Sequence, residues 1–451
     1  MDCGLSTIRV RAITGREGRE GRILYNSPAS MSARVTLKVT GGPLTGRVFS
    51  YDRHDTFLFG RSPDCHAELA ANDTTASRHH FLLEVNPPQA RLRDLGSLNG
   101  THVNGQKHGG RGRQESPEEA AGRRLPEVDL RDGDHIRVGA TVFEVAIEGH
   151  RSTAPADAAA DGDSGLEGLL GVRPAVPVEV PGYEVGKMIG RGGMGAVYLA
   201  RRTEDGATVA LKVMLAQSDV DDAARENFRR EIEITRSLRH PRIVALIDHG
   251  STESTFYFAM EYCAGGSVAD LQRRQSGGLP LTLSVRIALE ALDGLAHAHE
   301  QGFVHRDLKP ENLLLADNAG SGAKVTDFGL AKSFQQAGLS GMTATGAVAG
   351  TLYFMPREQL THFRLLKPVS DVWSMGATLY HMLTGAYPRE FRPGEDPLPV
   401  ILRGGVVPIR ARDPRLPERV ATVVDRSVVD VVAERYQTAG EFRDALAGAM
   451  S

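Results

Sequence analysis

Cysteine is scarce in this chain, and its scarcity excludes a disulfide framework. The 451 residues include three cysteines, Cys3, Cys65 and Cys263, which lie far apart and lack the spacing of metal ligands. Such usage is typical of proteins from a reducing compartment. We therefore expect free thiols and a cytoplasmic location.

Long apolar runs and a strong net charge are missing as well. No run approaches the roughly 18 to 20 apolar residues that cross a bilayer, and the N-terminus lacks the apolar core of a signal peptide. Acidic and basic residues nearly balance, 56 against 53, for a net charge of -3. This balance argues against nucleic acid as the main partner. Any phosphate chemistry must come from local clusters.

Changes in residue pattern divide the chain into four parts. Residues 1–30 are rich in arginine without an apolar period and are predicted to be disordered. Residues 34–148 show strand-like alternation and predict an all-β domain. Residues 149–181 are dominated by Ala, Asp, Gly and Pro and predict a flexible linker. Residues 183–448 are strand-rich up to about Tyr262 and helical beyond it, which predicts an α+β domain with the strands first.

Two apolar patterns support these assignments. Val35, Leu37 and Val39 alternate as in a half-buried strand, before a turn at Gly41-Gly42-Pro43. The helical part of the last domain shows the spacing of a buried helix in Ile287, Leu289, Leu292 and Leu295.

A glycine-rich segment opens the last domain. Gly190, Gly192 and Gly195 stand where a strand–turn–strand brings backbone amides close to phosphate oxygens without a Cβ in the way. The motif alone is weak, because a glycine-rich turn is more often only a turn. The residues that follow decide its meaning.

Three further motifs follow in order. Lys212 ends Val-Ala-Leu-Lys on a predicted strand, and Glu231 lies on the next charged helix, where a carboxylate can hold an ammonium that grips phosphates. A surface salt bridge is the alternative for this pair. The segments His305–Asn312 and Asp327-Phe328-Gly329 then supply a base and two oxygen ligands for Mg²⁺. Four motifs in register make coincidence negligible.

With these motifs, residues 183–448 resemble a eukaryotic-type serine/threonine protein kinase of the kind found in bacteria. The resemblance implies a bilobal α+β fold, ATP and Mg²⁺ as cofactors, and transfer of the γ-phosphate to Ser or Thr hydroxyls of protein substrates. The stretch Asp-Leu-Lys-Pro-Glu-Asn in the catalytic loop resembles the Ser/Thr branch of the family and not the tyrosine branch.

The resemblance also assigns a role to single residues. Asp307 accepts or steers the proton of the acceptor hydroxyl, and Lys309 steadies the γ-phosphate. Lys212, oriented by Glu231, holds the α and β phosphates. The implied metal ligands are Asn312 and Asp327, and the implied nucleotide contacts are Ile189, Gly190, Gly192, Gly195, Val197, Ala210, Lys212, Met260, Glu261 and Cys263.

One departure from the family pattern concerns the end of the activation segment. Most members read Ala-Pro-Glu where this chain has Pro356-Arg357-Glu358. A pair between Glu358 and Arg435 remains expected, and Asp371-Val372-Trp373-Ser374 resembles the segment that supports the catalytic loop. The rival reading is a pseudokinase that only scaffolds, with a loosened platform for protein substrates.

A second set of motifs lies in the all-β domain. It comprises Phe59-Gly60-Arg61, Ser77-Arg78-His79-His80 and Ser97-Leu98-Asn99-Gly100-Thr101. A guanidinium offers a planar fork to phosphate oxygens, a serine hydroxyl adds a donor, and an asparagine can hold a peptide backbone. The ordered set resembles a forkhead-associated (FHA) domain, an all-β sandwich that recognises phosphothreonine.

The FHA resemblance implies that Arg61 and Ser77 bind phosphate, that Arg78 lies nearby and that Asn99 reads the peptide main chain. Each part has a plainer explanation. Asn99-Gly100 is also a common hairpin turn, and His80 is expected to be a structural hydrogen-bond partner. The long Gly/Arg/Glu-rich insertion between Asn104 and Asp132 is predicted to be a solvated loop.

Thr343 and Thr345 connect the two domains in this interpretation. They lie in the segment that such kinases order by phosphorylation and resemble the paired threonines of bacterial relatives. We expect autophosphorylation there, with Arg306 clasping the phosphate. The same phosphothreonines are candidate FHA ligands, within one chain or in a second copy. Alternatively, both are ordinary loop residues and the FHA domain serves only other phosphoproteins.

Overall fold

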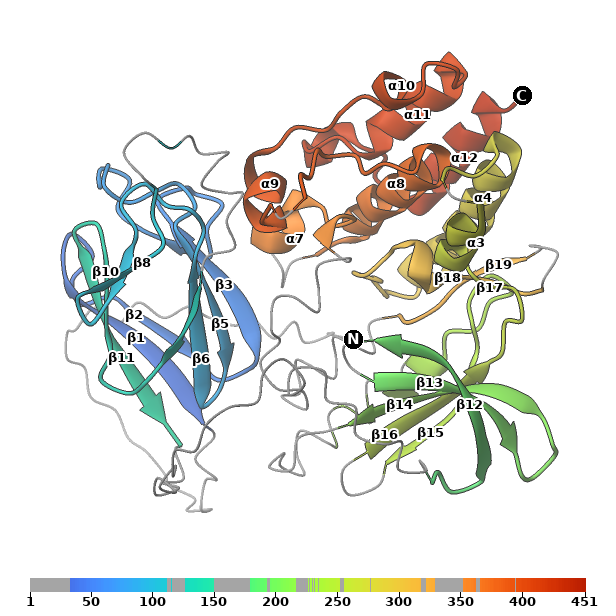
Figure 1. The fold of residues 1–451 in the computed structure, drawn as a ribbon, viewed down its shortest axis with the longest axis horizontal. Coiled ribbons are helices and arrows are strands. Elements are labelled where there is room, and N and C mark those ends of the chain that lie inside the picture. Colours follow the sequence, from blue (N-terminus) through green and yellow to red (C-terminus); the bar gives the residue numbers. More distant parts are fainter. Residues whose placement is uncertain are drawn as a thin grey trace, which may run out of the picture. The chain divides into compact units, whose positions relative to one another are not determined.

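The computed structural model describes residues 33–111, 115, 126–149, 179–192, 195–215, 226, 228, 230, 232–233, 235–251, 255–275, 277–317, 322–328, 352–361, 366–393 and 395–451 (Figure 1). They form two compact units that divide near residue 151. The predicted disordered head and most of the predicted linker lie outside the described residues.

The first unit is a sandwich of two β-sheets, as its alternating sequence predicts. One sheet has the strand order β2-β1-β11-β10-β7-β8 and the other β4-β3-β5-β6-β9. Its strands are β1 (Arg34–Gly41), β2 (Val48–Tyr51), β3 (Asp55–Gly60), β4 (Ala67–Glu68), β5 (Phe81–Asn86), β6 (Gln89–Asp94), β7 (Thr101–Val103), β8 (Gln106–His108), β9 (Glu127–Leu130), β10 (His135–Val138) and β11 (Thr141–Glu148). Neighbours pair antiparallel except β3 and β4, which pair parallel.

The core of this sandwich comes from the inward face of each strand. Val35, Leu37 and Val39 are fully buried, which confirms the alternation read from the sequence. Phe59 lies at the centre, stacked on Phe81 with ring centroids 4.5 Å apart and edge-on to Phe143 at 5.8 Å. Such aromatic pairs fix the spacing of the two sheets, and the loops that leave β3, β4 and β6 are therefore held on a rigid frame.

The second unit begins with a five-stranded antiparallel sheet in the order β12-β13-β14-β16-β15. Its strands are β12 (Tyr183–Gly192), β13 (Gly195–Arg202), β14 (Thr208–Leu215), β15 (Leu246–Ser251) and β16 (Thr255–Glu261). Val180, which the sequence assigned to the linker, is buried against Tyr183 in the apolar cluster of this sheet.

The rest of the second unit is mainly helical (Figure 1). A small sheet of β17 (Gly266–Ser267), β18 (Leu313–Leu315) and β19 (Ala323–Val325) carries the loops that follow. The helices are α3 (Val268–Gln275), α4 (Leu281–Glu300), α7 (Arg357–Thr361), α8 (Pro368–Thr384), α9 (Pro397–Arg403), α10 (Ile409–Arg412), α11 (Glu418–Ser427) and α12 (Ala439–Ala449), with 3-10 turns at Pro310–Asn312 and Val432–Glu434.

Helices α4 and α8 form the centre of this part. Ile287, Leu292 and Leu295 of α4 are fully buried, as their spacing predicts, and belong to the same apolar cluster as residues of α8 and α12. Leu289, the fourth residue of the predicted buried face, is only partly buried and packs against this cluster. Helix α8 starts with Pro368 and ends at Gly385 in the left-handed conformation, the usual proline-first and glycine-last arrangement. Among the described residues, no helix combines the length and apolar character needed to span a membrane.

Candidate functional sites

A buried aspartate of α8 holds the loop that precedes β18. Asp371 accepts hydrogen bonds from the backbone N–H groups of His305 (2.7 Å) and Arg306 (2.8 Å), and from Nε2 of His299 (2.8 Å). Burial alone raises the pKa of Asp371, but the bonds from His299 and from the backbone hold it below its usual value. The carboxylate thereby stabilises Arg306 in a left-handed conformation, φ 67°, that a non-glycine residue seldom adopts.

The residues after Arg306 form a compact polar cluster. Lys309 Nζ lies 3.1 Å from Asp307 Oδ2, and Asn312 Nδ2 donates to the same oxygen at 3.1 Å. Asn312 also donates to the backbone carbonyl of Asp307 at 2.7 Å. A carboxylate, an ammonium and an amide that the sequence placed in one loop are thus in direct contact.

His305 connects this loop to the strand that leads to Asp327. Its Nδ1 accepts a hydrogen bond from the backbone N–H of Asp307 (3.2 Å), so the proton is on Nε2, which donates to the carbonyl of Thr326 (2.7 Å). The imidazole that makes both bonds is fully buried. The arrangement keeps Asp307 and Asp327 in a fixed relation.

Asp327 combines a strained backbone with a carboxylate oxygen that accepts no hydrogen bond from the described residues. Its φ is 63°, and Oδ2 lies 2.8 Å from Lys212 Nζ. Burial raises the pKa of this carboxyl, but the ammonium of Lys212 holds it below its usual value. Oδ1 is buried and receives no hydrogen bond from the described part of the chain. A buried anionic oxygen without a protein partner suits a hard cation such as Mg²⁺.

The five-stranded sheet of the second unit carries most of the predicted nucleotide contacts. Ala210 lies opposite Met260, and both are buried, while Ile189 is exposed. Gly195 and Gly190 differ in whether the surrounding protein leaves room for a Cβ atom. A Cβ on Gly195 would come within 2.1 Å of the Val213 carbonyl oxygen, so strand packing requires glycine there. A Cβ on Gly190 would meet nothing nearer than 3.7 Å, so packing within the protein does not explain that glycine.

The strand end at Glu261 is tied to the strand before Asp327. The Glu261 carboxylate lies 2.6 Å from Lys324 Nζ, and the Glu261 N–H donates to the carbonyl of Ala245 at 2.9 Å. The side chain is therefore engaged inside the protein, which leaves the backbone of this stretch as the part suited to contact an adenine edge. Burial raises the pKa of the Cys263 thiol to about 11, so it is neutral at physiological pH.

Glu358 and Arg435 form the ion pair expected from the sequence. Arg435 Nη2 donates to Glu358 Oε2 at 2.9 Å, and Arg435 Nη1 donates to Oε1 at 2.5 Å, a two-pronged contact with a buried guanidinium. Gln359 Nε2 donates to the carbonyl of Arg306 at 2.7 Å. The altered residues at 356 and 357 therefore leave this pair intact, and the segment remains attached to the catalytic loop.

Several predicted residues lie outside the described part of the chain. They are Glu231, Gly329, Thr343 and Thr345. Their roles remain predictions from the sequence.

In the first unit, Ser77 connects three loops that carry the FHA motifs. The Ser77 carbonyl accepts from the N–H of Arg61 (3.2 Å), and its hydroxyl oxygen accepts from the N–H of Leu98 (2.9 Å). The hydroxyl proton is thus directed away from that bond and can donate to a ligand. Arg61 Nε is buried, and no described residue accepts a hydrogen bond from it, whereas Arg78 is exposed.

Asn99 is exposed and is held by the neighbouring loop. Its Nδ2 donates to the carbonyl of Thr75 at 2.8 Å, which leaves the side-chain oxygen available. Asp73 fixes that loop, because it accepts from the N–H of Thr75 (3.0 Å) and from the N–H of Ala140 (2.9 Å). Sequence reasoning missed Asp73, whose position four residues before Ser77 in a polar loop was the available signal.

His80 is a structural residue, as the sequence interpretation expected. Its Nδ1 accepts from the N–H of Ser77 at 2.9 Å, and its Nε2 donates to the carbonyl of Gly100 at 3.3 Å. Burial lowers the pKa of this imidazole and keeps it neutral. The tight hairpin turn is made by Asn104 and Gly105, both with positive φ, between β7 and β8. Asn99 therefore remains in the open loop.

A buried thiol also connects two of the loops that carry or flank the FHA motifs. Cys65 Sγ donates to the carbonyl of Arg78 at 3.3 Å, and Asp64 Oδ1 accepts from His79 Nε2 at 2.9 Å. Burial raises the pKa of Cys65 to about 12, which keeps the thiol protonated and able to donate. The three side chains are close enough to hold a metal, but their contacts describe a hydrogen-bonded link between two loops.

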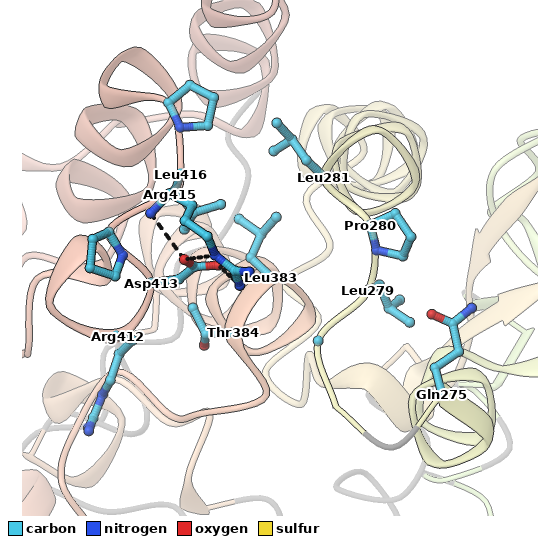
Figure 2. A pocket seen from close by; sticks show the side chains of 13 residues that line it. Gln275, Leu279, Pro280, Leu281, Leu383, Thr384, Arg412, Asp413, Arg415 and Leu416 are labelled. Carbon is cyan, nitrogen blue, oxygen red and sulfur yellow. Dashed lines mark hydrogen bonds and ion pairs between the residues drawn. The ribbon is translucent and has the colours of Figure 1, made fainter.

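A surface pocket of ≈ 810 Å³ lies in the helical part of the second unit (Figure 2). The ends of α3 and α8, the start of α4 and the segment from Arg412 to Pro417 line it. Figure 2 shows Arg415 folded onto Asp413, with Nε and Nη2 donating at 2.8 and 3.0 Å. The lining includes none of the predicted nucleotide or catalytic residues.

Comparisons with known proteins match each unit to a family. The family model described as a protein kinase domain matches residues 183–422, more than half of the chain, and the model of the FHA domain matches residues 57–117. The serine/threonine-protein kinase PknJ of Mycobacterium tuberculosis is 34% identical over 275 residues, which are 60% of this chain and 45% of that protein. PknB of the same species is 34% identical over 268 residues, 58% of this chain and 42% of that protein.

Solved structures are similar as well. The crystal structure of Rad53 1-466 in complex with AMP-PNP is 23% identical with a TM-score of 0.49 and covers 91% of this chain and 98% of that chain. The PknI kinase domain of M. tuberculosis is 25% identical with a TM-score of 0.47 and covers 61% of this chain and 98% of that one. This chain spans less than half the length of the curated relatives it matches. Because the protein kinase model matches more than half of its residues, the chain belongs to the protein kinase family, and it carries an FHA domain ahead of the kinase domain.

Proposed function

We propose that this protein is an ATP- and Mg²⁺-dependent kinase that phosphorylates Ser or Thr residues of proteins, and that its FHA domain binds phosphothreonine. One observation carries the catalytic part of the proposal. Asp307, Lys309 and Asn312 contact one another on a loop that the buried Asp371 holds in a strained conformation. A protein retains such strain where the geometry is used.

Each residue of this cluster has a distinct task. Asp307 orients the acceptor hydroxyl and receives its proton, and Lys309, 3.1 Å from that carboxylate, neutralises charge on the transferred phosphoryl group. Lys212 holds the non-transferred phosphates. Asn312 and Asp327 would hold Mg²⁺, which neutralises charge on the phosphates when bound. Lys212 would then leave Asp327 for the nucleotide.

The nucleotide assignment rests on the five-stranded sheet of the second unit. Gly190 has room for a Cβ but carries none, which is understandable where a phosphate approaches the backbone. Ile189 and Val197, both accessible, together with buried Ala210 and Met260 offer apolar surface for a purine. The backbone at Glu261 and Cys263 is proposed to meet the adenine edge.

The rival function is a pseudokinase that binds partners without catalysis. Incubation of the full chain with ATP and Mg²⁺, alone and with a generic Ser/Thr protein substrate, decides between the two when sites are mapped by mass spectrometry. We expect phosphate on Ser and Thr, including Thr343 or Thr345, and none with Asp307→Asn. An absence of incorporation in the wild-type chain with intact ATP binding would establish the scaffold.

The phosphothreonine proposal rests on Arg61 and Ser77. The buried Nε of Arg61 is a donor without a protein acceptor among the described residues. The Ser77 hydroxyl oxygen accepts from Leu98, so its own proton can be donated to a phosphate. Binding of a peptide spanning residues 341–349, with and without phosphate, should be measured on full-length Asp307→Asn protein, which cannot phosphorylate the peptide. We expect binding only with phosphate and its loss in Arg61→Ala. Equal binding of both peptides would refute phosphate recognition of this segment.

The remaining assignments follow from these two functions. We propose domain limits at residues 34–148 and 183–448, with Val180 packed on the second domain, a flexible linker that runs from residue 149 and ends before Val180, and a disordered head at residues 1–30. Protein substrates and phosphothreonine-containing proteins are the proposed partners, including a second copy of this chain, and neither nucleic acid nor a membrane span is part of the proposal. We place the protein in the cytoplasm. Activation by autophosphorylation predicts that the double variant Thr343→Ala, Thr345→Ala has lower activity.

A further inference from the structure

We infer that Arg389 is a positioning residue for the binding of protein substrates. It holds the end of the activation segment at Pro356-Arg357, where the sequence departs from its family pattern. The inference rests on the proposed kinase function. It adds to the Glu358–Arg435 pair a second buried arginine that contacts the end of the activation segment.

The contacts of Arg389 join three separate parts of the helical region. Its Nη2 donates to Asp430 Oδ1 at 2.5 Å, and its Nη1 donates to the carbonyl of Met355 at 3.3 Å. The guanidinium carbon lies 4.5 Å from the ring centroid of Trp373 on α8. Arg389 is only 1% exposed. A guanidinium that is stacked on an aromatic ring and paired at both ends of its fork has a single well-defined position.

The cost of burying this charge points to a specific use. An arginine is removed from water only where partners replace the lost hydration, and an apolar side chain would pack the same space without that cost. Burial lowers the pKa of Arg389, and Asp430 opposes that shift. The backbone carbonyl of Met355 is a contact that an apolar side chain cannot make.

Asp430 couples Arg389 to the pair predicted from the sequence. Its side chain pairs with Arg389, and its backbone carbonyl accepts from Arg435 Nη2 at 3.2 Å. Arg435 in turn holds Glu358, three residues beyond Met355. The two arginines thus hold the segment on either side of Pro356-Arg357, where the usual Ala-Pro is replaced. Arg389 therefore fixes the backbone on which a protein substrate must align beside Asp307.

Enzyme kinetics on the full chain test this role. We expect Arg389→Met and Arg389→Lys to raise the KM for a protein substrate about tenfold, because both lose the fork to Met355 and Asp430. The KM for ATP should change by less than about twofold, since no nucleotide contact involves this residue. Arg415→Met is the matched control, because that arginine is 89% exposed and its guanidinium donates to Asp413 on the protein surface.

A second measurement does not depend on activity. Amide hydrogen exchange of residues 352–361 should accelerate at least tenfold in Arg389→Met, while exchange in α4 stays unchanged. Far-UV circular dichroism reports whether the variant remains folded, since it does not depend on the Trp373 ring that Arg389 contacts. If Arg389→Met fails to fold, Arg389→Lys serves in both measurements.

The outcomes separate this inference from the proposed function. An unchanged KM for the protein substrate together with unchanged exchange at residues 352–361 would overturn the positioning role and leave kinase activity standing. Equal changes in both KM values with faster exchange in α4 would show a general packing role and overturn it too. If the wild-type chain transfers no phosphate, the proposed function fails, and the exchange measurement alone still decides whether Arg389 holds the segment.

Discussion

Replacement of Asp371 by asparagine tests how the catalytic loop is held. The substitution keeps the size of the side chain but leaves one oxygen where the carboxylate has two. That single oxygen cannot serve the N–H groups of both His305 and Arg306 as well as Nε2 of His299. The amide N–H₂ group must also face a donor, so at least one of the three hydrogen bonds is lost and replaced by a donor–donor contact in a fully buried site.

The structure sets the size of the effect. A hydrogen bond to a charged group contributes about 1.5–3 kcal/mol to stability, and breaking a buried charged contact typically costs about 3–5 kcal/mol. We therefore expect the free energy of unfolding of the kinase domain to fall by about 3–5 kcal/mol. For a domain of this size the Tm would fall by about 10 °C. Arg306 would also relax from its left-handed conformation and displace Asp307, so kcat should fall at least about a hundredfold.

Thermal unfolding and steady-state kinetics at a temperature where the variant is folded check both effects. Asp293→Asn is the matched control: that aspartate lies on α4, pairs with Arg443 at 2.9 Å and is half exposed, so it should change Tm by little. ATP affinity should be retained in both variants, because the proposed contacts with adenine and with the phosphates lie on the strands and not on α4 or α8. Wild-type Tm and kcat in Asp371→Asn would refute the reasoning.

Two further predictions concern a glycine pair and a partly buried histidine. Gly195→Ala should lower Tm by several degrees, because its Cβ would meet the Val213 carbonyl oxygen at 2.1 Å, whereas Gly190→Ala should leave Tm unchanged and weaken ATP binding. Thermal shift with and without ATP measures both, and a Tm loss at Gly190 would contradict the assignment. Burial lowers the pKa of His381 to about 4, against about 6.5 in the unfolded chain. Between these values the unfolded state binds more protons, so this histidine should cost the fold about 2 kcal/mol between pH 7 and pH 5. Urea unfolding at both pH values should show a smaller loss for His381→Phe, and an equal loss in the two proteins would reject the cause.

Local patterns were enough to predict much of the fold. The alternation of Val35, Leu37 and Val39 predicted β1. The spacing of Ile287, Leu289, Leu292 and Leu295 predicted the buried face of α4, where all but Leu289 are fully buried. These signals are local, because each depends only on the period of a single strand or helix. An ordered motif likewise predicted that Asp307 and Asn312 lie together, since both belong to one short loop, and the structure brings their side chains into contact.

Contacts between distant segments could not be read from the sequence. Arg389 lies 34 residues from Met355 and 41 from Asp430, and nothing in its own neighbourhood distinguishes it from a surface arginine. The contact of Lys212 with Asp327 and the small sheet of β17, β18 and β19 depend in the same way on how the chain folds back. Their partners were each visible in the sequence, but the pairing requires three-dimensional structure.

The central claim is that the loop around Asp307 performs phosphoryl transfer. The most direct measurement compares wild-type protein with Asp307→Asn for two quantities, the Kd for ATP in the presence of Mg²⁺ and the rate of γ-phosphate transfer to a Ser/Thr protein substrate. The account predicts Kd values within about threefold of each other and a rate at least about a thousandfold lower in the variant, because Asp307 acts on the acceptor hydroxyl. Equal transfer rates in the two proteins, or a wild-type chain that binds ATP and transfers nothing, would contradict it.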